Sequence, residues 1–140
     1  MDFKGSLGYL IHELAQAITA ESDQILTERF DIGFSQYKVM LVLCEKEGIQ
    51  QKYIAMELSQ TEASISRQIG VLIDKDLVEI GASEDNRQHP IYLTPEGKEL
   101  MQRASNYLNN SISLYFDNLN DIQLSRLRET LQLIRRRIAP

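Results

Sequence analysis

Apolar residues recur at steps of three and four along most of this chain, a spacing that places them on one face of an α-helix. The clearest case runs from Leu7 to Phe30, which has no proline and no glycine after Gly8 and predicts one long amphipathic helix. The helices predicted from this spacing span residues 7–30, 34–45, 50–58, 62–75, 95–116 and 121–138.

Several of these helices have recognisable capping residues at their ends. We expect Ser35 to be the N-cap of the second helix and Gly48 to stop it. Thr61 suits the N-cap of the fourth helix, and Thr94 that of the fifth, whose first residue would be Pro95.

The middle of the chain predicts a winged helix-turn-helix. The helices over 50–58 and 62–75 are separated only by a short turn, as in a helix-turn-helix. Beyond Leu77 the period changes to two, so that 78–80 and 90–94 are expected to be strands of a β-hairpin, the wing. The predicted fold class is mainly α with a small β-hairpin wing.

We expect a single domain over residues 1–140, with a winged helix-turn-helix core over about 31–97. The segments 1–30 and 98–140 carry more apolar surface than so small a core can cover. They are therefore expected to be dimerisation helices of a homodimer. The alternative is a monomer in which these helices pack on their own core.

The composition, 43% hydrophobic and 25% charged, is that of an ordinary globular protein. Residues 1–10 resemble neither a signal peptide nor part of an 18-residue membrane span, so we expect a cytoplasmic protein with no membrane partner. One cysteine and two histidines cannot by themselves form a structural zinc site, and no metal or cofactor is expected. Cys44 lies in an apolar run and is expected to be a buried, inert thiol rather than a redox sensor.

The helix over 62–75 has the chemistry of a DNA-reading helix. The residues expected to face the core are Ile65, Ile69, Leu72 and Ile73. The side chains on the opposite face are small or can form hydrogen bonds near the start of the helix. On that side Arg67 could read guanine and Gln68 adenine in a major groove. Gly70 disfavours the helix by about 1 kcal/mol relative to alanine, which is easier to understand if a partner passes close to the backbone. A solvated helix face with an incidental arginine is the alternative, and the net charge of −5 argues mildly against nucleic acid.

The order of these parts resembles the MarR (multiple antibiotic resistance regulator) family over essentially the whole chain. The residues that carry the resemblance are Ile54–Leu58, Ser64–Arg67, Leu72, Leu77–Val78, Asp85–Arg87 and Leu93–Gly97. Two features depart from the family pattern. Glu79–Gly81 stands where members commonly have basic residues, so wing contacts with phosphate should be weaker here. Cys44 lies in the second helix, whereas the peroxide-sensing branch has its cysteine in the first.

The resemblance implies that Arg87 in the wing reaches the minor groove, a role that suits arginine physically, with Asp85 on the same side of the strand to hold it. An exposed ion pair without a DNA role is the alternative for these two residues. The DNA-binding residues implied are Gln51, Lys52, Ala63, Ser64, Ser66, Arg67, Gln68, Asp85, Arg87 and His89. A small-molecule pocket, as found in the family, would be lined by Tyr9, His12, Tyr37, Met40 and Tyr107, although such residues are more often plain core.

The function expected from this resemblance is sequence-specific binding of double-stranded DNA at a palindromic operator. The regulator would be a repressor that is released by a small aromatic or anionic effector. The alternative is a winged-helix protein-interaction module, which the acidic balance allows. An enzyme is not expected, because the sequence has no Ser-His-Asp order, no phosphate-cradling glycine loop and no paired carboxylate motif.

Overall fold

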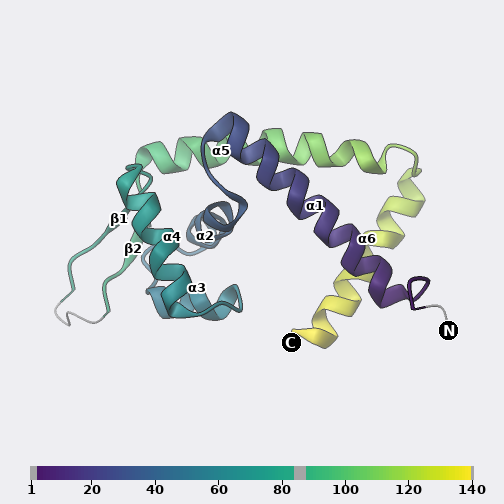
Figure 1. Ribbon diagram of the computed structural model, residues 1–140, viewed down its shortest axis with the longest axis horizontal. Helices are drawn as coiled ribbons and strands as arrows, with labels where there is room; N and C mark the ends of the chain where they lie inside the picture. The colour runs from purple at the N-terminus through teal and green to yellow at the C-terminus, as the bar shows by residue number, and fades with distance from the viewer. Residues whose placement is uncertain (1–2, 84–87, 140) are drawn as a thin grey trace. The chain divides into compact units, whose positions relative to one another are not determined.

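The computed structural model describes residues 3–83 and 88–139 (Figure 1). The chain forms two compact units, Met1–Leu108 and Asn109–Pro140. Its elements in order are α1 (Leu7–Phe30), α2 (Phe34–Glu45), α3 (Gln51–Glu57), α4 (Glu62–Asp74), β1 (Val78–Ile80), β2 (Ile91–Leu93), α5 (Pro95–Ser113), the 3-10 helix η1 (Leu114–Phe116) and α6 (Asp121–Ile138). This order confirms the predicted fold class. No helix in the described ranges is both long and apolar enough to cross a membrane.

Helix α1 has the predicted bounds and buries only its second half. It begins after Ser6, whose Oγ accepts a hydrogen bond from the Tyr9 N–H at 3.2 Å. Ser22 and Leu26 are buried in the first unit. The apolar face of the first half is exposed at Leu7, Leu10, Ile11 and Leu14.

Helix α2 has the predicted bounds, Phe34–Glu45, but Ser35 lies inside it, so the assignment of Ser35 as its N-cap is wrong. The N-cap is Gly33, and the side chain of Gln36 accepts a hydrogen bond from the Gly33 N–H at 2.8 Å. The Phe34 N–H donates to the carboxylate of Asp23 on α1, also at 2.8 Å. A side chain from another helix thus takes over the capping that a local serine was expected to provide.

The core of the first unit takes side chains from α1 to α5 and from the sheet, with α2 supplying the most. The largest fully buried side chains are those of Leu26, Ile32, Val39, Met40, Leu43, Ile54, Ile65 and Leu72. Cys44, which was expected in this core, is instead exposed. It lies in the last turn of α2, beside the exposed Glu45 and Lys46.

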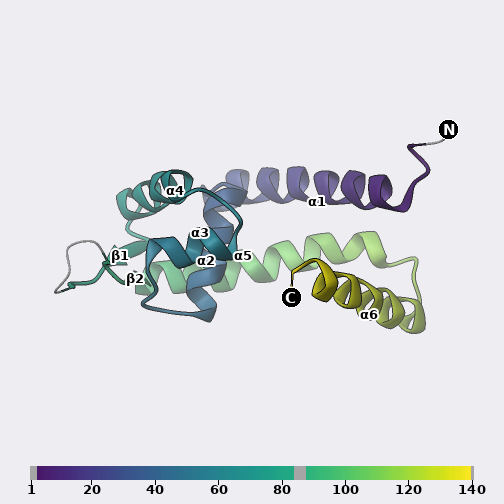
Figure 2. The same cartoon turned by 90° about the horizontal axis from the view of Figure 1, so that it is seen from below.

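The helix-turn-helix and the wing follow the predicted order. Thr61 is confirmed as the N-cap of α4, because its Oγ1 accepts a hydrogen bond from the Ser64 N–H at 3.1 Å. Strand β1 pairs with β2 in antiparallel register, and an isolated bridge joins Ile49 to Ile91. The strands lie at an edge of the unit and extend away from its helices (Figures 1 and 2). The predicted wing residues Asp85 and Arg87 lie outside the described residues.

Thr94 caps α5 as predicted and also ties this helix to the end of α4. Its Oγ1 accepts a hydrogen bond from the Gly97 N–H at 3.0 Å and donates to the Asp76 carbonyl oxygen at 2.7 Å. Gly97 packs so closely on the Leu77 carbonyl that a Cβ at this position would overlap it. The wing and α5 are therefore held at a fixed place beside α4.

The second unit is built around α6, whose first turn has a complete capping box. Asn120 Oδ1 accepts from the Gln123 N–H at 2.8 Å, and Gln123 Oε1 accepts from the Asn120 N–H at 3.0 Å. No residue of α6 is buried. Its exposed apolar side chains are Ile122, Leu127, Leu131, Leu133 and Ile138. A shallow apolar hollow of about 250 Å³ is lined by Phe116, Leu124, Leu127, Arg128, Leu131 and Gln132.

Candidate nucleic-acid interface

Helix α4 presents the outer face that its sequence predicts. Ile65, Ile69 and Leu72 are buried, and Ile73 is half-buried at the margin of the core. The exposed residues on the outer side are Ala63, Ser66, Arg67, Gly70, Val71 and Asp74. No hydrogen bond or ion pair holds the Arg67 guanidinium within the described ranges. Arg67, the one long basic side chain on this face of α4, is therefore exposed to solvent and free to bind a partner.

No packing contact with the described residues explains the glycine at position 70. A Cβ added at this position would meet no atom within 4 Å, and the backbone there is helical. Because glycine weakens a helix by about 1 kcal/mol relative to alanine, the bare backbone at Gly70 is a cost to folding without a compensating contact.

Two residues expected to read bases are engaged inside the protein. The Gln68 Oε1 accepts a hydrogen bond from Gln36 Nε2 on α2 at 3.3 Å. The Ser64 Oγ donates to Gln60 Oε1 at 3.1 Å, within the helix-turn-helix turn. Both side chains are only half-exposed. This geometry favours a structural role for Gln68 and Ser64 and leaves the outer face to Ala63, Ser66, Arg67 and Gly70.

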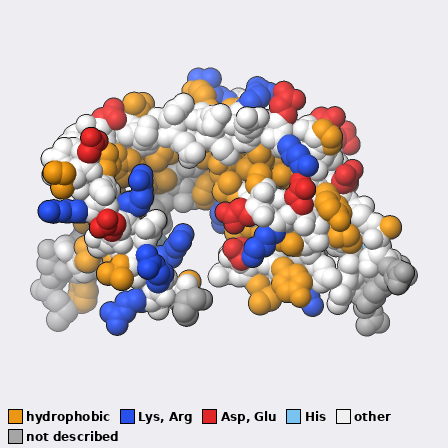
Figure 3. Space-filling view, turned by 180° about the vertical axis from the view of Figure 1, so that it is seen from behind, with side chains coloured by type: hydrophobic (Ala, Val, Ile, Leu, Met, Phe, Trp, Pro, Cys, Tyr) orange, Lys and Arg blue, Asp and Glu red, His pale blue; other side chains and the backbone are white. Residues whose placement is uncertain are grey.

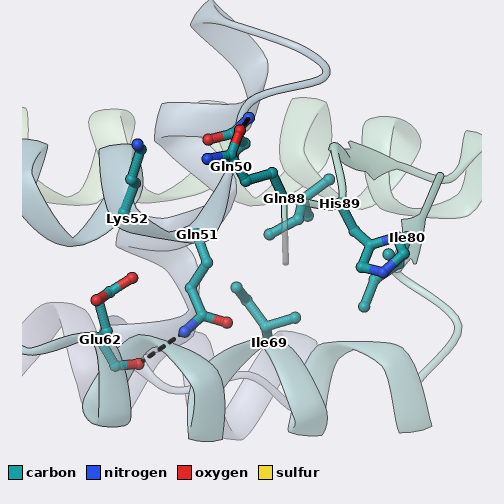
Figure 4. A pocket seen from close by; sticks show the side chains of 9 residues that line it. Gln50, Gln51, Lys52, Glu62, Ile69, Ile80, Gln88 and His89 are labelled. Atoms are coloured by element: carbon teal, nitrogen blue, oxygen red, sulfur yellow. Dashed lines mark hydrogen bonds between the residues drawn. The ribbon is translucent and has the colours of Figure 1, made fainter. Parts of the chain in front are cut away.

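The start of α3 lies next to the start of α4 and to the wing, around a cavity of about 260 Å³ (Figure 4). Gln51 Nε2 donates to the backbone carbonyl of Glu62 at 3.1 Å and so joins the two helix starts. Lys52 is exposed, with its Nζ 5.1 Å from the centre of the Tyr53 ring. The cavity is lined by Gln50, Gln51, Lys52, Glu62, Ile69, Ile80, Gln88, His89 and Ile91. Three elements that a DNA duplex could contact together thus converge here.

Sequence reasoning missed Gln50 and Glu62 in this region. Gln50 Nε2 donates to Gln88 Oε1 at 3.0 Å, which links the start of α3 to the wing. His89 Nδ1 lies 3.2 Å from the Gly81 carbonyl oxygen across the hairpin. The contacts of Gln50 join residues 38 positions apart, so no local pattern in the sequence signals them.

The five residues expected to line a small-molecule pocket do not gather in one place. Tyr37 and Met40 are buried in the core, where the Tyr37 hydroxyl lies 3.0 Å from Ser105 Oγ. Tyr107 is half-buried, with the Arg29 guanidinium 4.3 Å from its ring centre. Tyr9 and His12 are exposed on the first half of α1, and Tyr9 lies thirteen residues before Ser22, or about 20 Å along the helix.

A wide, open groove of about 670 Å³ lies between α1 and the start of α2. Lys38 Nζ lies 5.5 Å from the centre of the Phe34 ring on one of its walls. The lining residues are Ala15, Gln16, Thr19, Ala20, Asp23, Phe34, Ser35 and Lys38. This wall offers an aromatic face and a cation next to each other.

Charge is distributed unevenly along the chain. Residues 109–140 carry five arginines and three carboxylates, a charge of +2, so residues 1–108 carry −7 of the overall charge of −5. Basic side chains gather over α6 on the face shown in Figure 3. The unit that contains α4 is therefore the acidic one, and any attraction for phosphate there must be local, around Lys52 and Arg67.

Cys44 is exposed but has a raised pKa. Partial burial of the sulfur raises the pKa most, and the carboxylates of Glu47 and Glu45 raise it further. The thiolate is therefore less populated at neutral pH than in a free cysteine, which is the opposite of an activated thiol. Among the described residues no three His, Cys, Asp or Glu side chains are grouped as metal ligands.

Comparison with known proteins gives a consistent result. The family model described as MarR family matches residues 30–89. An uncharacterized HTH-type transcriptional regulator of Bacillus subtilis, YhbI, is 32% identical over 108 residues, which are 76% of this chain and 70% of that protein.

Three solved structures have the same fold. A MarR-family transcriptional regulator from Rhodococcus sp. RHA1 has a TM-score of 0.85 at 22% identity, over 96% of this chain and 95% of its own. CouR from Rhodococcus jostii RHA1, bound to p-coumaroyl-CoA, has a TM-score of 0.81 at 22% identity, over 96% of this chain and 94% of its own. MepR of S. aureus, in complex with DNA, has a TM-score of 0.78 at 20% identity, over 98% of this chain and 99% of its own. Taken with the winged helix-turn-helix and the exposed face of α4, these matches show that the chain belongs to the MarR family of HTH-type transcriptional regulators.

Proposed function

We propose that this regulator binds a palindromic operator in double-stranded DNA as a homodimer and acts as a repressor. The observation that carries the proposal is the outer face of α4, where Arg67 is exposed and unpaired beside the bare backbone at Gly70. A helix with this face fits the major groove, in which arginine reads guanine. The structural neighbour MepR is a protein of this fold in complex with DNA.

In this proposal α4 supplies Ala63, Ser66 and Arg67 to base edges, and the start of α3 supplies Gln51 and Lys52 to the phosphate backbone. Gln68 and Ser64 stay in place as supports of α4 through the hydrogen bonds described above. Arg87, with Asp85, is assigned to the minor groove by the family resemblance, and His89 to the base of the wing.

The homodimer is supported by the apolar residues that the terminal helices leave exposed. Those of α1 are Leu7, Leu10, Ile11 and Leu14, and those of α6 include Leu127, Leu131 and Leu133. Apolar stripes of this kind are typical of surfaces that a second copy covers. A two-fold dimer should place its recognition helices about one duplex turn apart, or roughly 34 Å and 10 bp. A monomer in solution at micromolar concentration would contradict the dimer.

An effector that releases the operator would bind in the open groove between α1 and α2. Its wall of Phe34 and Lys38 suits a small aromatic or anionic compound, through stacking and charge. CouR, a structural neighbour, binds the acyl thioester p-coumaroyl-CoA. The effector of the present protein is proposed only as a compound of this aromatic or anionic class.

The proposal is tested by pulling down genomic DNA fragments with the purified protein and then titrating the enriched duplex at several salt concentrations. We expect a near-palindromic sequence, and a log–log salt slope of about 0.9 for each phosphate that is neutralised. Repeating the pull-down with small aromatic acids should remove the same fragments.

The acidic charge of residues 1–108 supports one competing function, a winged-helix module that binds protein rather than DNA. The two proposals differ in the same titration. A flat salt response with no preferred sequence would favour the protein-interaction module, because only phosphate binding releases counterions from a duplex.

A further inference from the structure

Side-chain hydrogen bonds join α2 both to α1 and to α4. Asp23 on α1 accepts a hydrogen bond from the Phe34 N–H at the start of α2, at 2.8 Å. Gln36 on α2 donates from Nε2 to Gln68 Oε1 on α4, at 3.3 Å. Helix α2 also packs directly on both of these helices. The start of α2 is therefore tied to α1 and to the proposed recognition helix at the same time.

Lys75 joins the end of α4 to the end of α1. It is the C-cap of α4, and its Nζ donates to the carbonyl oxygen of Asp31, the C-cap of α1. The Nζ also lies 3.4 Å from the Asp31 carboxylate, but that side chain is 95% exposed, so the ion pair contributes little. The bond to the carbonyl is the stronger contact, because the cation there also faces the negative end of the α1 dipole.

The three contacts close a circuit through three helices. They are Asp23–Phe34, Gln36–Gln68 and Lys75–Asp31, and together they form a three-helix brace around the turn between α1 and α2. Helix α4 packs mainly on α2, α3 and β1, and Lys75 adds a direct contact with α1. Holding a lysine side chain in one place costs rotamer freedom, so this contact must return more than it costs.

The brace lies between the two parts of the chain whose relative position matters for an operator with two half-sites. In the proposed function α1 belongs to the dimer interface and α4 reads the major groove. The separation of the two recognition helices in a dimer then depends on where α4 lies relative to α1 in each chain. One base pair of extra spacing changes that separation by roughly 3.4 Å and the relative rotation by about 35°.

We propose that Lys75 is a positioning residue, which together with the Gln36–Gln68 bond fixes α4 relative to α1 and so sets the half-site spacing that the dimer accepts. A braced α4 cannot follow a changed spacing without losing these bonds, whereas an unbraced α4 can shift. The brace also reduces the conformational freedom that α4 loses when the duplex binds. This inference rests on the proposed function, both the homodimer and the operator.

The test measures affinity for the operator and for versions whose half-sites are moved together or apart by one base pair. The spacing ratio is the affinity for the operator divided by that for a shifted version. The wild type should give at least about 10-fold, the cost of one lost base contact or more. Lys75→Met should reduce this ratio about 2- to 10-fold, as the loss of one hydrogen bond predicts, with base preference unchanged. A smaller folded fraction lowers all affinities equally and cancels in the ratio.

Three further variants separate the brace from charge and from folding. Lys75→Arg retains the donor and the charge, so it should keep the wild-type ratio. Lys46→Met is the matched control, because it makes the same chemical change at an exposed position of the first unit and should leave the ratio unchanged. Gln36→Met removes another side of the brace and should also lower the ratio. It decides the question if Lys75→Met does not fold.

The outcomes distinguish this inference from the proposed function. An unchanged ratio in Lys75→Met, or an equal drop in Lys46→Met, would overturn the inference while the proposed function stands. The same holds if the wild type binds the operator equally well at every spacing. If the wild type binds no duplex, both the inference and the proposed function fail.

Discussion

The side chains of Gln36 and Gln68 meet at 3.3 Å between α2 and α4, with Gln36 Nε2 donating to Gln68 Oε1. Gln36 also accepts from the Gly33 N–H through its own Oε1, so this one amide caps α2 and contacts α4. Gln68, which the sequence assigns to base reading, thereby joins α4 to α2.

The Gln36–Gln68 bond predicts that Gln68→Ala leaves base preference unchanged. The variant should lose about 0.5–1.5 kcal/mol of unfolding free energy, the value of one ordinary hydrogen bond. Urea denaturation and titration against single-base operator variants measure the two effects separately. A changed preference at one base pair would show instead that Gln68 turns toward the duplex on binding.

Arg67 and Arg87 should respond differently to substitution, because they are assigned to different grooves. Arg67→Ala should cost about 1–3 kcal/mol on the operator and relax the preference at a particular base pair. Arg87→Ala should weaken binding to most sequences and keep the major-groove preference. Both variants are titrated against the operator, its single-base variants and random duplex at one salt concentration. Indistinguishable profiles, or no loss from either variant, would rule out this docking arrangement.

Gly70→Ala should stabilise the protein and weaken operator binding. The added methyl group meets no atom of the chain, so helix propensity should raise the unfolding free energy by about 1 kcal/mol. In a close groove the same methyl group should cost about 1–3 kcal/mol of binding, as overpacked contacts do. Gly8→Ala is the matched control, because a Cβ there also meets no atom within 4 Å. Improved stability with unchanged binding would mean that no DNA approaches α4 at Gly70.

Alkylation of Cys44 should have its midpoint at a higher pH than alkylation of a free cysteine. Burial and the carboxylates of Glu47 and Glu45 raise the pKa of this thiol, so the reactive thiolate forms only as the pH rises through the raised value. Neutralising both carboxylates by substitution with glutamine should lower the pKa and speed the reaction at pH 8. The measurement is the rate of labelling by iodoacetamide against pH, with Cys44→Ser as the blank. A midpoint below that of free cysteine would contradict the assignment of an inert thiol.

The sequence by itself determined the elements whose signals are local. The 3.6-residue spacing of apolar positions gave α1 its observed bounds, and Thr61 and Thr94 marked the starts of α4 and α5 because an N-cap acts within its own turn. The inward face of α4 also followed from spacing alone, since Ile65, Ile69 and Leu72 are one stripe of one helix. The family pattern could be recognised because it consists of such local signals in a fixed order.

Only the tertiary structure decided which polar side chains are free to act. Asp23 supplies a cap to α2 from another helix, Gln36 holds Gln68, and Gln50 reaches the wing across 38 positions. Tertiary structure also decided the exposure of Cys44, which ends an apolar run in the sequence and yet is exposed. The physical reason is the same for all of these residues. Hydrogen bonds and burial depend on which segments of the chain meet in space. The pattern of residues along the sequence does not say which distant segments will meet.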